Sequence, residues 1–272
     1  MIFDTHAHYD DPAFDEDRDE LLSSFREKGI GAVTDPASTW ESIGEIRSLT
    51  KRWPFLFGAY GIHPEEIGGV PGADESGDRM PDRVLETIRE ACRDSKAVAV
   101  GEIGLDYHWN KEDRKRQIEW FEAQIALARQ EKLPVIVHSR DAAADTMDIA
   151  RRTHLGDVGG VMHCYAYSLE MAKEYLDMGL YLGIGGVATF KNARRLREVL
   201  SYAPLSQLVL ETDCPYLTPE PRRGTRNDSG NLPLVVRAIA SIRGISPEEV
   251  ETATWENAMR MYRIAPGTIP GT

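Results

Sequence analysis

Two histidines near the beginning of the chain, His6 and His8, have a spacing that could bind a metal ion. They follow a short apolar segment, and alternate residues of an extended chain point to the same side, so both imidazoles can reach one ion. A His-x-His pair is weak evidence by itself, because local hydrogen bonds can satisfy two such side chains equally well. A metal site therefore needs further ligands from the rest of the chain.

Potential metal ligands also stand where later apolar segments end. They are Glu102, His138, His163 and Asp213, and His63 has a comparable position. Taken singly, each is more commonly a helix cap, an ion-pair partner or a hydrogen-bonded core histidine. Unrelated histidines would scatter among helices and loops, and buried polar groups cost free energy unless they are paired. We therefore interpret this recurrence as a metal centre.

The number of ligands predicts two divalent metal ions, because four histidines and two carboxylates exceed the three or four protein ligands of one catalytic ion. Glu102 lies midway along the chain and is the expected bridge. The first ion would take His6, His8, Glu102 and Asp213, and the second would take Glu102, His138 and His163. Such a pair activates water and stabilises both oxygens of a displacement at phosphorus, and Asp213 could accept a proton from the water. The ligand types suit Zn, Mn, Ni or Mg equally.

Four further side chains in these end segments could contact a substrate. His63 could bind a substrate phosphate or leaving group, or it could brace the loop that follows it. A later loop carries Arg222, Arg223 and Arg226, of which we take Arg226 as a substrate contact. Guanidinium groups bind phosphate through paired hydrogen bonds, but a solvated turn would accommodate these residues equally well.

Other residues beside the expected ligands are assigned supporting roles. Glu211 shares a face with the carboxylate two residues later and should orient a ligand. Asp106 and Arg140 could either orient ligands or contact a phosphate. Cys164 and Cys214 directly follow expected ligands, so their side chains should point away from the metal ions and pack among their neighbours.

These ligands need a scaffold that brings distant segments together, and the apolar segments supply it. We predict eight strands, at residues 1–3, 30–33, 55–60, 97–100, 133–137, 158–162, 180–184 and 208–210. Short, continuous apolar segments of this kind are typical of buried parallel strands. Helical patterns fill the intervals, so the alternation predicts an α/β protein with a (β/α)8 TIM barrel. In such barrels the active site lies at the C-terminal ends of the strands, where the expected ligands occur.

The helical patterns carry start signals. Ser246, Pro247 and Glu249 suit the cap, the first position and the third position of an extra helix that closes the C-terminus. Asp141 is expected to cap a helix that runs to Ala150. An open doubly wound sheet is the alternative fold, but that fold usually carries a glycine-rich turn after its first strand, where this chain has histidines.

Composition limits the class of protein. The 272 residues are 42% hydrophobic, and we predict a single domain over residues 1–272. The chain has no apolar stretch near the ~20 residues of a membrane span, no secretory signal, and three cysteines without a C-x-x-C spacing, so we expect a cytoplasmic protein. The net charge of −12 repels polyanions, so a phosphate-ester substrate would need metal ions or a local basic loop.

Seven segments resemble the TatD family of metal-dependent deoxyribonucleases and occur in family order. They are DTHAH (4–8), GIHP (61–64), GEIGLDYH (101–108), VHSRDA (137–142), HCY (163–165), ETDCPYLTP (211–219) and TWENAMRMY (254–262). The resemblance implies a TIM barrel of the amidohydrolase-like superfamily. It implies a two-metal site on His6, His8, Glu102, His138, His163 and Asp213, with Glu102 bridging. It also implies hydrolysis of DNA phosphodiester bonds, often as a 3′-to-5′ exonuclease on single-stranded ends, and no obligate protein partner.

Two other functions remain open. A metal-dependent hydrolase of esters or amides, including an aminoacyl-tRNA deacylase, could use the same centre. Related barrels that cleave amides often bridge their metal ions with a modified lysine on the fourth strand, whereas this chain has Glu102 there, which favours the nuclease. A binding protein that kept the fold without turnover would be expected to have lost ligands, and all six are present here.

Overall fold

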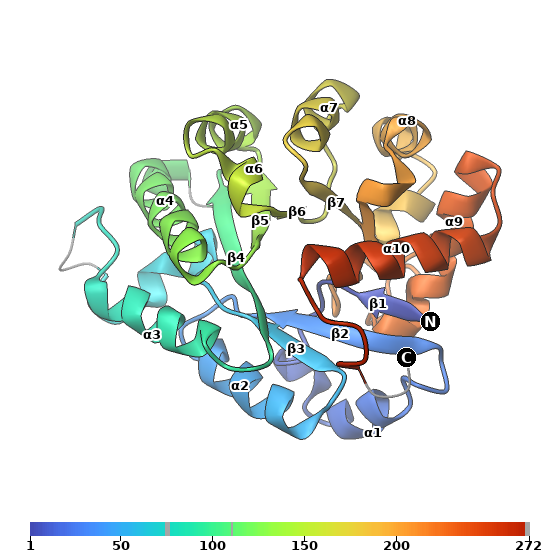
Figure 1. The fold of residues 1–272 in the computed structure, drawn as a ribbon, viewed down its shortest axis with the longest axis horizontal. Helices are drawn as coiled ribbons and strands as arrows, with labels where there is room; N and C mark the ends of the chain where they lie inside the picture. Colours follow the sequence, from blue (N-terminus) through green and yellow to red (C-terminus); the bar gives the residue numbers. More distant parts are fainter. Residues whose placement is uncertain (74–76, 110, 270–272) are drawn as a thin grey trace. The chain divides into compact units, whose positions relative to one another are not determined.

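The computed structural model describes residues 1–73, 77–109 and 111–269. The chain forms two compact units, which are described separately below. The first unit comprises residues 1–35, 54–56 and 163–272, and the second comprises residues 36–53 and 57–162. In both units parallel strands alternate with helices, as Figure 1 shows.

The first unit contains four strands in the order β7-β8-β1-β2. The strands are β1 (Ile2–Asp4), β2 (Ile30–Pro36, of which residues 30–35 belong here), β7 (Tyr181–Ile184) and β8 (Leu208–Leu210). β1 pairs in parallel with β2, β7 pairs in parallel with β8, and the Thr5 amide donates to the Leu210 carbonyl at 2.8 Å beside β1 and β8. The helices are η1 (Pro12–Phe14), α1 (Arg18–Ser23), α7 (Leu169–Asp177), η5 (Gly186–Thr189), α8 (Arg194–Tyr202), η6 (Leu205–Gln207), η7 (Ser229–Asn231), α9 (Leu232–Arg243) and α10 (Pro247–Met261).

Helix α10 is the predicted extra helix after the last strand. Its start is the predicted capping box, in which the Ser246 hydroxyl accepts from the Glu249 amide and the Glu249 carboxylate accepts from the Ser246 amide. α10 (red in Figure 1) packs against β1 and β8. Phe3 of β1 lies with its ring centroid 5.8 Å from the ring of Trp255 and 5.8 Å from that of Tyr262. This apolar contact holds the strand that leads into the His-x-His pair.

The second unit contains four strands in the order β3-β4-β5-β6, with parallel pairing throughout. The strands are β3 (Leu56–Ala59, from residue 57), β4 (Ala97–Asp106), β5 (Val135–Arg140) and β6 (Gly160–Met162). The helices are α2 (Ser42–Arg52), η2 (Pro64–Gly69), α3 (Asp82–Cys92), η4 (Lys111–Asp113), α4 (Arg114–Glu131), α5 (Ala143–Arg152) and α6 (Leu155–Val158).

Strand β4 is much longer than the apolar pattern predicts. It continues from the expected end at Val100 to Asp106, and after a register shift between Val100 and Ile103 it pairs with β5 as far as the pair Asp106 and Arg140. The backbones of the two strands approach closely where Gly104 faces His138, since a Cβ built on Gly104 would lie 1.9 Å from the His138 carbonyl oxygen. The polar residues that interrupt the pattern are thus buried inside the strand.

The helix after β5 begins differently from the expectation. α5 begins at Ala143, and Asp141 does not cap it, because the capping position is Ala142 and no side chain there accepts a hydrogen bond. Asp141 instead has a positive φ of 53° and places its carboxylate 3.0 Å from His108 Nδ1. The prediction for Asp141 was therefore wrong, since its carboxylate pairs with a neighbouring loop.

The predicted fold class is confirmed. The described residues form eight parallel strands, each followed by a helix, and α10 comes after the eighth strand and its helix. This is the element order of a (β/α)8 barrel. Within the described residues, no helix is both long and apolar enough to cross a membrane.

Candidate active site

Three of the expected ligands of the first unit lie just beyond the ends of β1 and β8. His6 Nε2 lies 3.1 Å from His8 Nε2, and Asp213 Oδ1 lies 3.8 Å and 3.6 Å from these two nitrogens. The chain turns sharply at Asp213, which has a φ of 56° and so directs its carboxylate toward the histidine pair. Two facing imidazole nitrogens cannot both carry a proton, so a lone pair is available between them.

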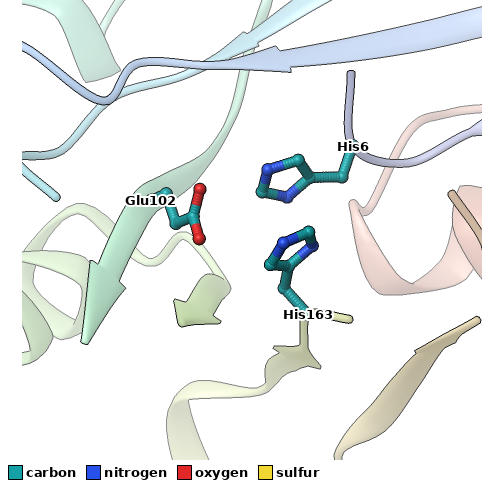
Figure 2. A group of neighbouring side chains, drawn as sticks. All are labelled: His6, Glu102 and His163. Carbon is teal, nitrogen blue, oxygen red and sulfur yellow. The ribbon is translucent and has the colours of Figure 1, made fainter. Parts of the chain in front are cut away.

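His163, the residue after β6, completes this group in the first unit. Its ring stacks on that of His6, as Figure 2 shows. The ring centroids are 3.5 Å apart and the planes differ by 19°. Its Nε2 atom lies 3.6 Å from Asp213 Oδ1. The first unit therefore gathers three histidines around one carboxylate, although these four residues come from three separate segments of the sequence.

Glu211 orients His163 in the way expected of a supporting carboxylate. Its Oε2 atom lies 3.2 Å from His163 Nδ1, and its Oε1 atom accepts the Cys164 amide at 2.5 Å. Gly183 leaves the space that the carboxylate occupies, since a Cβ there would lie 2.2 Å from Glu211 Oε2. A carboxylate on one ring nitrogen fixes which nitrogen is left for a metal ion.

The two cysteines beside the ligands differ in placement. Cys214 is buried, as the packing prediction required. Cys164 was predicted to point away from the ligands, and this was wrong, because its sulfur belongs with His163 and Asp213 to a group of potential ligand atoms that all lie within 4.8 Å of one another. The reason is the left-handed backbone at Cys164, with a φ of 46°, which breaks the alternation of a strand.

The charge of Asp213 is stabilised by its histidines. Burial by itself raises the pKa of the Asp213 carboxyl, but a hydrogen bond with His8 and the positive charge of the His163 and His6 rings lower the pKa below its usual value. A second carboxylate behind the site, Asp4, accepts from the Ser229 hydroxyl at 2.6 Å and holds the backbone that leads into His6. Asp213, the residue expected to accept a proton, is therefore ionised at neutral pH.

The second unit brings together Glu102, His138 and His63. Glu102 is buried in β4, where Figure 2 draws its carboxylate. His138 of β5 places Nδ1 3.0 Å from Glu102 Oε1, and His63 places Nε2 3.7 Å from the same oxygen. Their potential ligand atoms all lie within 4.8 Å of one another.

Asp106 holds His138 from the other side. Its Oδ2 atom lies 2.9 Å from His138 Nε2, while its Oδ1 atom accepts the amides of His108 and Trp109. Burial raises the pKa of Asp106, but the His138 hydrogen bond and these two amides lower it further, so the carboxyl stays ionised. Asp106 was expected either to orient a metal ligand or to contact a phosphate, and this geometry fits the first role, with His138 as the ligand that it orients.

His63 fits both of the roles considered for it. Its Nδ1 atom accepts the Glu65 amide at 3.2 Å and caps η2, so it braces the following loop. Its Nε2 atom is left to face Glu102, and its ring lies 4.3 Å from that of His138. Glu65 itself has a pKa raised to about 7, chiefly by burial and then by the nearby Asp106. A substrate contact by His63 stays a prediction.

Two buried glutamines that the sequence reasoning missed support the second unit's site. Gln124 of α4 pairs with both backbone groups of Ile62, accepting the amide at 2.8 Å and donating to the carbonyl at 3.2 Å. Gln117 pairs in the same way with Asp106, at 2.8 Å and 2.9 Å. A signal existed, because polar residues seven apart on an apolar helix face need buried partners.

The arginines of the loop after β8 have protein partners. Arg226 donates to both carboxylate oxygens of Asp17, at 2.7 Å and 2.5 Å, and to the Ala13 carbonyl, and its guanidinium lies 4.7 Å from the centre of the Phe14 ring. Arg222 donates to Asn231 and Arg223 lies over Phe190. The predicted substrate contact of Arg226 stays a prediction, and these contacts give the side chain a bracing role.

The donor atoms of both units fit divalent metal ions. Each unit turns imidazole nitrogens and carboxylate oxygens toward one another at distances that a coordinated ion could bridge, and this mixture suits Zn, Mn, Ni or Mg. In the first unit, Glu211 fixes one nitrogen of His163 and leaves the other toward Asp213. This arrangement is typical of metal-binding histidines.

Known proteins resemble this chain over almost its whole length. The profile of a family described as TatD related DNase matches residues 3–263. The uncharacterized metal-dependent hydrolase YabD of Bacillus subtilis (strain 168) is 38% identical over 97% of this chain and 100% of its own. The 3′-5′ ssDNA/RNA exonuclease TatD of Rahnella sp. (strain Y9602) is 31% identical over 97% of this chain and 99% of its own. The crystal structure of YjjV, a TatD homologue from Escherichia coli K12, matches with a TM-score of 0.88 at 29% identity, over 97% and 98% of the two chains.

The fold, the ligand groups and these relatives together define a metal-dependent hydrolase on a (β/α)8 barrel. The alternative of an open doubly wound sheet is thereby excluded. Within this class, the chain belongs to the TatD family.

Proposed function

We propose that this protein hydrolyses phosphodiester bonds of single-stranded nucleic acid, as a 3′-to-5′ exonuclease acting on DNA ends. Residues 1–272 act as one hydrolase domain. The observation that carries the proposal is the pair of ligand groups, one in each unit, at the carboxyl ends of the strands. The name of the Rahnella relative, an exonuclease on single-stranded DNA and RNA, supports the choice of substrate.

Two divalent ions are assigned to six residues of the chain. The first ion would be held by His6, His8, Glu102 and Asp213, and the second would be held by Glu102, His138 and His163. When bound, such a pair supplies an activated water and neutralises charge on the phosphate oxygens. Glu102 would contribute to both ions, since its carboxylate belongs to more than one group of potential ligand atoms.

Other steps depend on side chains of the protein: accepting a proton, contacting the phosphate and positioning the histidine rings. Asp213 accepts the proton that the attacking water gives up, and its lowered pKa keeps it ready in the ionised form. His63 donates through Nε2–H to a phosphate oxygen, because its Nδ1 atom is occupied by the Glu65 amide. Glu211 and Asp106 keep the rings of His163 and His138 in place.

A nuclease assay on metal-loaded protein tests this proposal. Single-stranded DNA, double-stranded DNA and RNA, each labelled at the 5′ end, report both cleavage and direction. We expect a ladder shortening from the 3′ end, loss of activity with a chelator, and losses of about 10²–10⁴-fold in Glu102→Ala and Asp213→Ala. The exposed Glu248→Ala serves as the matched control and should retain full activity.

Metal analysis completes the test. We expect two ions per chain in the wild type and fewer in Glu102→Ala, with circular dichroism confirming that each variant is folded. A folded, metal-loaded protein that leaves DNA and RNA intact but hydrolyses a small ester or an aminoacyl-tRNA would overturn the proposal in favour of the ester and amide hydrolase.

A further inference from the structure

One large apolar side chain stands exposed next to the second unit's ligand group. Among the described residues, the exposed large hydrophobic side chains are Met1, Trp109, Tyr202 and Tyr216, and Trp109 has the largest exposed fraction, 62%. Exposing an indole to water costs free energy, and binding of a planar partner would recover part of that cost. Its place in the chain, just beyond β4, puts it at the end of the strands where substrate is expected.

The backbone of Trp109 is anchored to a residue of the site. Its amide donates at 3.0 Å to Asp106 Oδ1, and the other oxygen of the same carboxylate lies 2.9 Å from His138 Nε2. Asp106 is buried, so this link is rigid. One carboxylate therefore sets the position of a predicted metal ligand and of the exposed indole together.

A cation accompanies the indole. The guanidinium of Arg140, the last residue of β5, lies 5.6 Å from the centre of the Trp109 ring. The ring of His108 meets the indole edge-on, with centroids 4.6 Å apart and planes 89° apart. An aromatic face beside a guanidinium is the combination that binds a nucleotide, because the face stacks on the base and the cation neutralises the phosphate.

We propose that Trp109 and Arg140 form a stacking subsite for an unpaired nucleobase of the substrate strand. The inference deepens the proposed function and rests on it for the identity of the strand. The net charge of −12 gives no broad attraction for a phosphate backbone, so affinity has to come from local contacts such as base stacking. Bases in a duplex are already stacked, so this subsite selects single strands.

Equilibrium binding tests the subsite directly. The probe is a dye-labelled single-stranded oligonucleotide with phosphorothioate linkages, which resist hydrolysis, and fluorescence polarisation is measured with metal-loaded protein. Trp109→Ala should bind about 5- to 100-fold more weakly than the wild type, and Trp109→Phe should recover part of the loss. Tyr202→Ala is the matched control, because Tyr202 is 53% exposed beneath a lysine but lies at the far end of α8, before β8 begins. It should bind as the wild type does.

A second probe separates stacking from charge. An abasic oligonucleotide of the same length keeps the phosphates and lacks the bases, so Trp109→Ala should bind it as the wild type does. The inference is overturned if the wild type does not bind the base-containing strand, or if Trp109→Ala leaves binding of that strand unchanged or weakens binding of both probes equally. Strong base-dependent binding without cleavage of an ordinary strand would contradict the proposed function and leave this inference standing.

Discussion

The two units assemble their ligand groups in chemically different ways. In the first unit, three histidines surround one carboxylate, and the nitrogens of His6 and His8 face each other at 3.1 Å. In the second unit, His138 is held between two carboxylates, with Glu102 on Nδ1 and Asp106 on Nε2. In the first group three imidazoles share one carboxylate, Asp213, whereas in the second group carboxylates lie within hydrogen-bond distance of both nitrogens of one imidazole.

This difference has a consequence for metal binding. A histidine that bridges two carboxylates has to give up a hydrogen bond, and the proton in it, before that nitrogen can coordinate an ion. In the first unit, Glu211 Oε2 lies 3.2 Å from His163 Nδ1, whereas Asp213 Oδ1 lies 3.6 Å from His163 Nε2, which is longer than an ordinary hydrogen bond. We therefore expect coordination by His138 to release more protons, and to depend more steeply on pH, than coordination by the histidines beside Asp213.

Both units use a buried carboxamide to hold the backbone beside a carboxylate, and removing it should have the largest effect on stability. Gln117 pairs with both backbone groups of Asp106, and Asn227 donates to the carbonyls of Thr212 and Tyr216. Because truncation strands two buried polar groups, we expect Gln117→Ala and Asn227→Ala each to lower the free energy of unfolding by about 2–4 kcal/mol. Urea denaturation measures this loss.

The control for this prediction lies on the same helix as Gln117. Gln130→Ala removes an exposed carboxamide that contacts only Arg89 among the hydrogen bonds of the described residues, so it should cost less than about 0.5 kcal/mol. Equal losses for Gln117→Ala and Gln130→Ala would show that the buried pairing contributes nothing. Such a result would contradict the statement that a buried carboxamide stabilises the backbone in both units.

Replacing the carboxylates that orient the metal-binding histidines should have the next largest effect, and this effect should be on metal affinity. Glu211→Gln loosens His163 in the first unit, and Asp106→Asn loosens His138 in the second. Replacing a carboxylate behind a metal-binding histidine typically costs about 10- to 100-fold in affinity. Calorimetric titration with zinc, repeated in buffers of different ionisation enthalpy, measures both the affinity and the protons released.

The same titrations decide whether the two units differ as described. Asp106→Asn should reduce proton release because it removes one of the two acids that hold His138, whereas Glu211→Gln leaves both of those acids in place and should release as many protons as the wild type. Equal proton release in both variants would contradict the comparison. Gly183→Ala is an independent probe, because its Cβ would displace the Glu211 carboxylate without touching the second unit's ligands.

The sequence could predict where these groups lie but not how they are held. Strand ends mark the positions of His6 and Asp213, because barrel strands deliver their C-terminal residues to one face. The length of β4 was underestimated because Glu102 and the glycines beside it break the apolar pattern, although the strand pairs with β5 on both sides of a register shift between Val100 and Ile103. The hydrophobic period and the polarity of a residue describe only its own segment of the sequence. The contacts that hold these side chains come from other segments, which the pattern does not identify.

The failures have the same origin. Asp141 has the type and position of a helix cap, yet its partner is His108 in a different loop. The side chain of Cys164 could not be placed by alternation, because its left-handed backbone depends on the Glu211 carboxylate that accepts its amide. The spacing of Gln117 and Gln124 on an apolar helix face indicates buried partners, but only the fold shows which backbone groups they pair with.

A buried carboxyl of the first unit provides a smaller, pH-dependent effect. The pKa of Asp35 is raised well above its usual value, first by burial and then by the charge of Asp10, whereas the pKa of Asp106 in the second unit is lowered. A carboxyl with a raised folded pKa stabilises the fold when protonated, and this contribution is lost as pH rises from the unfolded pKa of about 4 through the folded pKa. Asp35→Asn does not titrate.

The stability of Asp35→Asn relative to the wild type should therefore increase with pH. We expect a gain of about 1 kcal/mol or more between pH 5 and pH 8, measured by urea denaturation in the presence of a chelator. The exposed Asp82→Asn is the control and should follow the wild type at both values. A constant or shrinking difference for Asp35→Asn would show that Asp35 is ionised in the folded protein at both values.

The smallest effect concerns Arg226, whose guanidinium bonds Asp17 and lies over Phe14 in the first unit. The ion pair is about one-third exposed on each side, so its loss in Arg226→Ala should lower the free energy of unfolding by only about 0.5–1 kcal/mol. Since these contacts occupy the guanidinium, we expect the KM of Arg226→Ala for single-stranded DNA to change less than twofold. Trp109→Ala of the second unit should raise that KM by more.

Asp17→Ala is the control, because it breaks the same ion pair and leaves the arginine in place. A KM that rises in Arg226→Ala but not in Asp17→Ala would show that Arg226 contacts the substrate, so that both units would contribute a substrate contact.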